Sequence, residues 1–287
     1  MKPASFSYRK PVSIAEAITL LAEYGEEGKI IAGGQSLVPS MNFRLARPET
    51  LIDINNIAEI QGVRDMPDHL EIGAVTRHAT FHHPVTPCPL GRMLTKVVAN
   101  IAHYPIRQRG TFGGSLSHAD PASEWCLVAT TMGAEMEIHG PSGSRRVAVA
   151  NYFKGTFVTA VGRDELLARI RLPKLPEGWG TGFYEFSRRK GDFALAMSLA
   201  ALKVEGGVIR GARLGLGAVG AHPQRLEALE ADMTGRPATA ETFAAIGEAA
   251  RGMVSASGDI HGSAEYRMEL VGTVIARALA QAAEDAA

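Results

Sequence analysis

The stretch Ile30-Ile31-Ala32-Gly33-Gly34-Gln35-Ser36-Leu37 joins a predicted strand to a pair of glycines and then to a small hydroxyl residue. Further along the chain, Arg109-Gly110-Thr111-Phe112-Gly113-Gly114-Ser115-Leu116 has the same chemistry, and it too is expected to follow a strand. Glycine has no Cβ, so backbone N–H groups can approach an anion, and the hydroxyl adds another donor. Two such segments suit a ligand with two phosphates, and the pattern predicts a dinucleotide held by its pyrophosphate.

Two common nucleotide sites do not fit these segments. Neither glycine pair is followed by the Gly-Lys-Ser/Thr of a phosphate-binding P-loop, and neither gives G-x-G-x-x-G within a strand–helix unit. A single Gly-Gly after a strand is more often only a turn, and the chain has 31 glycines in 287 residues. The parallel chemistry of the two segments therefore carries the prediction of a ligand site.

Composition limits the functions that this chain can have. It is 46% hydrophobic and 21% charged, with 30 basic and 30 acidic residues, so neither a nucleic acid nor an anionic membrane is an expected partner. No run approaches the roughly 18 apolar residues of a spanning helix, and Met1–Phe6 lacks an apolar signal core, which predicts a cytoplasmic location. Only Cys88 and Cys126 are present, whereas an iron–sulfur cluster usually needs about four cysteines. Any cluster that exchanges electrons with this chain must lie on another polypeptide.

The order of predicted elements favours an α+β fold. Ser13-Ile14-Ala15-Glu16 reads as a capping box for a helix that ends near Gly25, and Leu51–Ile54 reads as a buried strand. Mixed short strands and helices follow, and the Pro- and Gly-rich segment Pro173–Gly180 is the best linker candidate. Beyond it we expect three antiparallel strands (182–187, 194–204 and 208–218), with a hairpin turn at Gly206-Gly207. Three helices (around 223–230, 240–253 and 264–283) should end the chain.

Several stretches resemble one known family. They are Ala32–Pro39, Gly110–Ser115 and Asp120–Glu124, with weaker support from Arg188–Ala194 and Glu265–Arg267. Over nearly its whole length the chain resembles the medium, FAD-binding subunit of the molybdenum hydroxylases, which include carbon monoxide, quinoline, nicotine and xanthine dehydrogenases. The resemblance implies a bipartite FAD-binding domain of the vanillyl-alcohol-oxidase type over residues 1–175, with subdomains of about 1–56 and 57–175. A C-terminal domain with a three-stranded antiparallel sheet and helices should cover residues 176–287.

The resemblance also implies roles for particular residues. The glycine segments should hold the phosphates, and the acid matching Glu124 bonds a sugar hydroxyl of FAD in the family, with Asp120 nearby. Locally, Asp120 is expected to cap a helix with Pro121 at its first position. The segment with Asp192 and Phe193 lies near the flavin ring in relatives. The candidate FAD-binding residues are Ala32, Gly33, Gly34, Gln35, Ser36, Leu37, His78, Gly110, Thr111, Gly113, Gly114, Ser115, Asp120, Glu124, Asp192 and Phe193. No catalytic residue or metal ligand is predicted, because the flavin carries the redox reaction.

The function that follows from the resemblance is electron transfer in a heterotrimer, often paired into a dimer of heterotrimers. A large subunit with a molybdopterin-type cofactor hydroxylates the substrate, and a small subunit with two [2Fe-2S] clusters passes electrons to this subunit's FAD. The FAD then delivers them to an external acceptor. The run Ser115–Ala119 departs from that of carbon monoxide dehydrogenase, which favours an aromatic N-heterocycle or another small organic substrate.

Two other functions remain open at this stage. A stand-alone FAD-dependent oxidase or dehydrogenase would share the bipartite fold, although such enzymes usually have a longer substrate domain; its own substrate would reduce its flavin. A non-catalytic assembly protein would bind the cofactor only weakly or transiently. Stoichiometric FAD retained through purification would argue against it.

Overall fold

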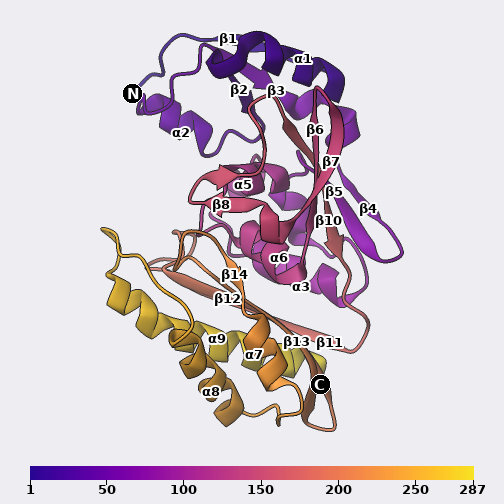
Figure 1. The fold of residues 1–287 in the computed structure, drawn as a ribbon, viewed down its shortest axis with the longest axis vertical. Coiled ribbons are helices and arrows are strands. Elements are labelled where there is room, and N and C mark those ends of the chain that lie inside the picture. Colours follow the sequence, from indigo (N-terminus) through magenta and orange to yellow (C-terminus); the bar gives the residue numbers. More distant parts are fainter.

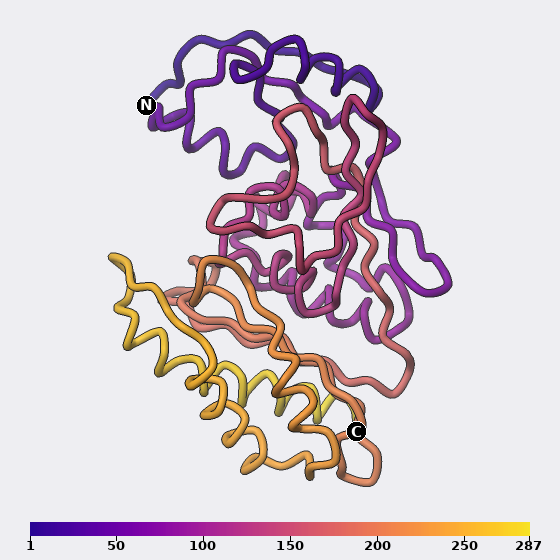
Figure 2. Tube along the Cα trace, in the orientation of Figure 1, coloured from indigo at the N-terminus to yellow at the C-terminus, as the bar shows by residue number.

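The computed structural model describes all residues from Met1 to Ala287 and contains three main β-sheets, each with its own helices. The chain builds them in order from one end of the molecule to the other (Figure 1). The colour sequence along the tube shows the N-terminal unit and the C-terminal unit at opposite ends, with the segment of intermediate colour between them (Figure 2). The α+β class predicted from the sequence is confirmed.

The N-terminal unit is a small parallel sheet with two helices. Its strands β1 (Ser7–Arg9), β2 (Gly28–Ile31) and β3 (Thr50–Asp53) pair in the order β1-β3-β2, and its helices are α1 (Ile14–Tyr24) and α2 (Leu37–Asn42). The predicted capping interaction of α1 is present, because Ser13 Oγ accepts a bond of 3.2 Å from the N–H of Glu16. The first glycine segment connects β2 to α2, at the carboxyl ends of the parallel strands.

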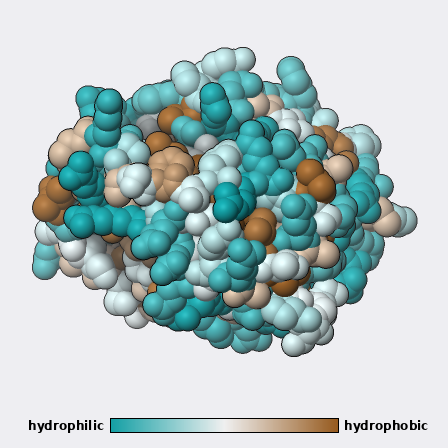
Figure 3. Space-filling model, turned by 90° about the horizontal axis from the view of Figure 1, so that it is seen from above, coloured by the Kyte–Doolittle hydropathy of each residue, from teal (hydrophilic) through white to brown (hydrophobic).

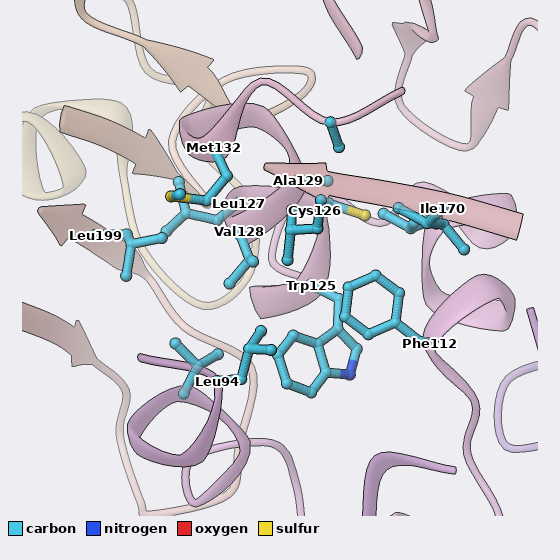
Figure 4. Packing of buried hydrophobic residues seen from close by; sticks show 14 of the residues in the cluster. Leu94, Phe112, Trp125, Cys126, Leu127, Val128, Ala129, Met132, Ile170 and Leu199 are labelled. Atoms are coloured by element: carbon cyan, nitrogen blue, oxygen red, sulfur yellow. The ribbon is translucent and has the colours of Figure 1, made fainter. Parts of the chain in front are cut away.

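The middle unit is a five-stranded antiparallel sheet with helices packed on it. The strands are β4 (Val63–Asp65), β5 (His69–Gly73), β6 (Glu135–Gly140), β7 (Gly143–Ala148) and β10 (Leu166–Pro173), in the order β4-β5-β10-β6-β7. The helices are α3 (Pro89–Val98), α4 (Tyr104–Arg107), α5 (Phe112–His118) and α6 (Glu124–Met132), and a hairpin is formed by β8 (Phe153–Gly155) and β9 (Val158–Thr159). Helix α6 is the centre of the core: Trp125 and its neighbours are completely buried and pack against Phe112, Ile170 and Leu199 (Figure 4).

The C-terminal unit is an antiparallel sheet covered by helices on its outer face (Figure 1). Strands β11 (Trp179–Phe186), β12 (Ala196–Glu205) and β13 (Val208–Gly217) match the three predicted strands. Gly206 and Gly207 make the predicted hairpin turn with φ of 58° and 74°, values that favour glycine. The helices are α7 (Glu227–Met233), α8 (Ala240–Arg251) and α9 (Ala264–Ala286).

The expectation of only three strands in this sheet, and of a helix from Pro223, is wrong. A short fourth strand, β14 (Gln224–Arg225), pairs with Gly215 and Leu216 of β13, and helix α7 begins only at Glu227. The Arg225 guanidinium lies 2.7 Å from a carboxylate oxygen of Glu230, one turn into the helix. This ion pair and the pairing with β13 favour an extended backbone where helix propensity alone predicts a helix.

The inner face of the C-terminal sheet packs against α3 and α6 of the middle unit. One hydrophobic cluster therefore contains both α6 residues and Phe183, Met197 and Leu199 of the C-terminal sheet. No helix combines the length and apolar character needed to cross a bilayer. Seen from the N-terminal end, the surface is mainly hydrophilic, with hydrophobic side chains in separate small areas (Figure 3).

Candidate functional site

A large cleft of about 1730 Å³ runs along the side of the three units. It is lined by the first glycine segment, the β8–β9 hairpin, helices α5 and α6, and three loops of the C-terminal unit. All candidate residues from the sequence lie on its wall: Ala32, Gly33, Gly34, Gln35, Ser36, Leu37, His78, Gly110, Thr111, Gly113, Gly114, Ser115, Asp120, Glu124, Asp192 and Phe193. Candidate residues separated by up to 161 positions, from Ala32 to Phe193, are thus brought to one surface.

The first glycine segment presents a row of unused donors. The backbone N–H groups of the five consecutive residues Gly33–Leu37 donate to no atom of the chain. The carbonyls of this segment are engaged instead, because Gln35 Nε2 donates to Gly33 O at 2.7 Å and Val38 N donates to Gly34 O at 3.0 Å. Gly34 has a φ of 72°, which favours glycine. Successive free N–H groups on a concave wall form an anion-binding surface without a cationic side chain.

The second glycine segment has its donors occupied. Gly113 N donates to Ala74 O at 2.9 Å, and Gly114 N and Ser115 N donate to the side chain and carbonyl of Thr111, each at 3.1 Å. Only the N–H of Thr111 lacks an acceptor in the chain. The expectation that this segment follows a strand is wrong, because it follows helix α4. Both of its paired glycines lie in the first turn of α5. The N–H groups that the sequence pattern predicted to be free are therefore used by Ala74, after β5, and by Thr111, the cap of α5.

The two segments touch each other through their backbones. A Cβ on Gly33 would overlap Arg109 O and would lie 2.7 Å from the Cα of Gly110. A Cβ on Gly113 would lie 2.5–2.7 Å from three atoms of Ala74, at the end of β5. These glycines are therefore required for close packing as well as for any approach of a ligand.

Two residues that sequence reasoning missed connect the segments. Asn55 Nδ2 donates to Ala32 O at 2.7 Å, and Arg77 Nη2 donates to Asn55 Oδ1 at 2.8 Å. The other Nη of Arg77 donates to Arg109 O. We call Asn55 and Arg77 the clamp, because they join the backbone before the first glycine pair to the backbone of the second segment. Asn55 follows a predicted strand directly, and a polar residue at that place was the available signal.

Carboxyl groups mark another part of the cleft wall. Asp120 Oδ1 accepts a bond of 2.9 Å from Ala122 N, while α6 begins at Glu124 after Ser123. The expectation that Asp120 caps the helix with Pro121 at its first position is wrong, because Asp120 closes a turn that precedes the helix. Burial raises the pKa of Glu124 to about 7; the N–H of its own helix start opposes this rise, and the charge of Asp120 adds to it. Near neutral pH this carboxyl is able to accept hydrogen bonds from hydroxyl groups.

The C-terminal unit supplies the remaining wall. Asp192 and Phe193 lie on the loop between β11 and β12, where Asp192 pairs with Arg189 at 3.1 Å and the Phe193 side chain is 73% exposed. Arg267, which is buried in α9, donates to Leu195 O at 2.9 Å and to Ala218 O at 2.7 Å. It therefore holds two of the cleft loops to each other. The motif Glu265–Arg267 did not indicate this contact in the sequence.

The donors and acceptors of the cleft define a class of ligand. A row of free N–H groups suits phosphates, a carboxyl elsewhere on the wall suits sugar hydroxyls, and an exposed aromatic side chain suits a ring. These residues fit an extended dinucleotide, and the protein is of the dinucleotide-binding α+β class.

Comparison with known proteins gives the family. Residues 4–175 match the family of the FAD binding domain in molybdopterin dehydrogenase, and residues 182–282 match the CO dehydrogenase flavoprotein C-terminal domain. The chain therefore belongs to the family of FAD-binding subunits of molybdopterin dehydrogenases. It is a flavoprotein subunit of an oxidoreductase, with FAD as its cofactor, as the resemblance predicted.

Three relatives show how close the match is. The chain is 39% identical to the alpha subunit of the 6-hydroxypseudooxynicotine dehydrogenase complex of Paenarthrobacter nicotinovorans, over 98% of this chain and 96% of that one. A structure of carbon monoxide dehydrogenase from Hydrogenophaga pseudoflava matches with a TM-score of 0.95 at 34% identity, over all of both chains. Quinoline 2-oxidoreductase from Pseudomonas putida 86 matches with a TM-score of 0.92 at 36% identity, over 100% of this chain and 99% of that one.

Proposed function

We propose that this chain is the electron-transfer subunit of a heterotrimeric molybdenum hydroxylase. In this role its FAD receives electrons from the [2Fe-2S] clusters of a small partner subunit and delivers them to an external acceptor. The observation that carries the proposal is the row of five free N–H groups at Gly33–Leu37, on the wall of a cleft that also holds Glu124, in a chain of this family.

The residues of the cleft would each have a distinct part in holding FAD. The N–H groups of Gly33–Leu37 bind the pyrophosphate, and Glu124 accepts a hydrogen bond from a sugar hydroxyl. Asp192 and Phe193 lie beside the flavin ring. FAD, when bound, supplies the redox chemistry, and the chain positions it and excludes water from it.

The partner subunits we propose would hold the metal cofactors for which this chain has no ligands. Cys126 is buried and Cys88 is half-buried, and neither is in a cluster of residues that could ligate a metal. We therefore propose a large subunit with the molybdopterin-type cofactor and a small subunit with two [2Fe-2S] clusters, in a dimer of heterotrimers. A cytoplasmic location stays a prediction of the sequence.

The substrate we propose for the complex is an aromatic N-heterocycle or another small organic molecule. Quinoline 2-oxidoreductase, at 36% identity, is a relative whose name contains such a heterocycle, and carbon monoxide dehydrogenase follows closely at 34%. Under this proposal the substrate binds to the large subunit. The cleft of this chain therefore needs no substrate pocket of its own.

The test is anaerobic reduction of the natively purified complex. We expect flavin, iron and molybdenum to copurify with two further chains, and a quinoline-type substrate to bleach the flavin only when all three chains are present. Carbon monoxide serves as the competing substrate. The isolated, FAD-loaded chain is the control, and we expect no substrate to reduce it. A complex without flavin would refute the proposal, and flavin reduction by a substrate on the isolated chain would establish a stand-alone oxidase instead.

A further inference from the structure

A histidine and a tryptophan form a buried pair behind the junction of the two glycine segments. His78 begins the short 3-10 segment His78–His82 and is only 4% exposed, yet it lines the cleft. The indole Nε1 of Trp125 in α6 donates to His78 Nδ1 at 2.9 Å. The Trp125 ring is fixed by Phe81 and Phe112, at centroid distances of 5.2 and 4.8 Å, and Figure 4 shows it beside Phe112.

This hydrogen bond decides where the histidine carries its proton. An indole N–H can only donate, so His78 Nδ1 must accept and cannot itself hold a proton. A neutral imidazole then has its proton on Nε2 and is a donor at that atom. The Trp125 side chain therefore selects one of the two neutral forms of His78.

The selected donor has no acceptor within the chain. The only hydrogen bond of the His78 ring is the one at Nδ1, so Nε2 bonds to no protein atom. A Cβ on Gly110 would overlap His78 Nε2 itself and would lie 2.6 Å from the neighbouring ring atom Cδ2, so the Nε2 edge of the ring lies against the Gly110 backbone. The next residue is Thr111, which has the only free N–H of the second glycine segment. A side chain donor and a backbone donor thus lie together on the cleft wall without partners.

The surroundings keep the ring neutral. Burial, together with the positive charges of Arg77 and Arg107, lowers the pKa of His78 to about 3. Arg77 precedes His78 directly, and Arg107 extends from α4 to bond the ring of His82 at the other end of the 3-10 segment. Arg109 follows α4, and Glu124 is the acidic group adjacent to Trp125 in α6. His78 is thus a neutral donor at every physiological pH.

We propose that Trp125 is a positioning residue that holds His78 in its Nε2–H form, so that His78 Nε2 donates to an acceptor oxygen of the bound dinucleotide beside Thr111. The inference rests on the proposed FAD site and adds a donor from a side chain to the row of backbone donors. A neutral donor of fixed form gives a hydrogen bond whose strength does not change with pH. Without the indole N–H, the histidine proton could move to Nδ1 and this bond would be lost.

The affinity of the full chain for FAD tests the donor. The chain is stripped of FAD, and its dissociation constant is measured by flavin fluorescence for the wild type and two variants. His78→Leu should raise this constant about tenfold, because one hydrogen bond is lost. His78→Gln should raise it less than threefold, because the glutamine amide can place an N–H near the position of Nε2.

Nitrogen NMR and FAD binding of Trp125→Phe together test the positioning role. The phenyl ring preserves packing on Phe81 and Phe112 but has no N–H. Burial and the charges of Arg77 and Arg107 are unchanged in this variant, so His78 stays neutral and its proton is free to move to Nδ1. We expect weaker FAD binding than in the wild type, together with a proton on His78 Nδ1 in the FAD-free variant. A packing defect alone would weaken binding while His78 stayed protonated on Nε2, and this result would overturn the proposal.

Nitrogen NMR of the stripped chain gives a readout that does not depend on FAD. The wild type should show His78 protonated on Nε2 alone from pH 5.5 to 8.5, and a proton on Nδ1 would overturn the proposal. If the wild type binds no FAD, the proposed function fails. If it binds FAD and His78→Leu binds equally well, only this inference fails.

Discussion

The two glycine segments resemble each other in sequence, but the chain uses them differently. In the first, five consecutive N–H groups are free, and the glycine pair lies in the bend between β2 and α2, with Gly34 at a φ of 72°. In the second, the glycines lie inside a helical turn, and their N–H groups bond to Ala74 and Thr111. Both segments need glycine for close packing, because a Cβ on Gly33 would overlap Arg109 O and a Cβ on Gly113 would overlap Ala74, but only the first segment leaves its backbone donors free. The same local sequence pattern can therefore serve a ligand in one place and the fold in another.

The largest effect is expected where the second segment packs on the sheet. In Gly113→Ala, the new Cβ would lie 2.5–2.7 Å from backbone and Cβ atoms of Ala74, which cannot move independently of β5. We expect a loss of about 2–3 kcal/mol in the free energy of unfolding, although alanine is the better helix former. Thermal and urea unfolding of the FAD-free chain measure it.

Gly252→Ala is the matched control for this packing effect. Gly252 ends helix α8, and a Cβ there would have its nearest neighbour at 3.5 Å. Its stability should remain within about 0.5 kcal/mol of the wild type. Equal stability of the two variants would mean that the second segment is not a packing element.

Introducing a negative charge into one glycine segment at a time shows which of the two binds the phosphates of FAD. Gln35 and Ser115 each follow a glycine pair directly, and both line the cleft. Gln35→Glu puts a carboxylate beside the free N–H groups, and we expect the dissociation constant of FAD to rise about 30-fold, or ~2 kcal/mol. Ser115→Glu should raise it less than about threefold. The measurement is FAD titration of the stripped chain, repeated at high salt, which should reduce the difference.

The variant Gln35→Glu needs its own control, because it also loses the bond from Gln35 Nε2 to Gly33 O. Gln35→Met loses that bond without adding charge and should bind FAD better than Gln35→Glu. Equal effects of charge at positions 35 and 115 would mean that both segments hold the phosphates alike.

The buried carboxyl of Glu124 should make the free energy of unfolding depend on pH. Burial raises its pKa from an ordinary value of 4.5 to about 7, so the folded chain binds this proton more tightly than the unfolded chain does. The resulting stabilisation is complete below about pH 4.5 and is lost as the pH rises through 7. Glu124→Gln should therefore gain about 1–2 kcal/mol relative to the wild type between pH 5 and pH 8.5, in the FAD-free chain.

Urea unfolding at the two pH values measures this gain. Glu23→Gln, at an exposed position of α1, should follow the wild type at both pH values. An unchanged pH slope in Glu124→Gln would show that this carboxyl is not held in its neutral form by burial.

Sequence patterns predicted the elements of this fold well where one local signal dominates. The capping residues of α1, the Gly206-Gly207 turn and the three long strands of the C-terminal sheet are such cases. The candidate residues all line one cleft. They could be named from the sequence largely because a family resemblance identified segments that are distant from one another in the chain.

The failures have a shared physical cause, which is competition from contacts outside the local sequence. Asp120 is a residue type that commonly caps helices, but its carboxylate accepts a hydrogen bond from Ala122 N and closes a separate turn. Gln224-Arg225 follows a proline in a helix-like context, yet pairing with β13 makes it a strand. The clamp residues Asn55 and Arg77 had no periodicity or motif, because their role depends on two backbone segments that meet only in the folded chain.

The smallest effect is expected at the clamp, which couples the two glycine segments. Arg77→Met removes the donors to Asn55 Oδ1 and Arg109 O but keeps an unbranched side chain of similar length. The first segment would then lose part of its fixed position, and we expect the dissociation constant of FAD to rise about fivefold, or ~1 kcal/mol. Arg64→Met, at an ion pair with Glu71 on the exposed side of β4, is the control and should leave FAD binding unchanged. If Arg77→Met lowers stability without affecting the FAD constant, the clamp serves the packing of the second segment only. A change in the FAD constant with little change in unfolding would show instead that the free donors of the first segment depend on the packed backbone of the second.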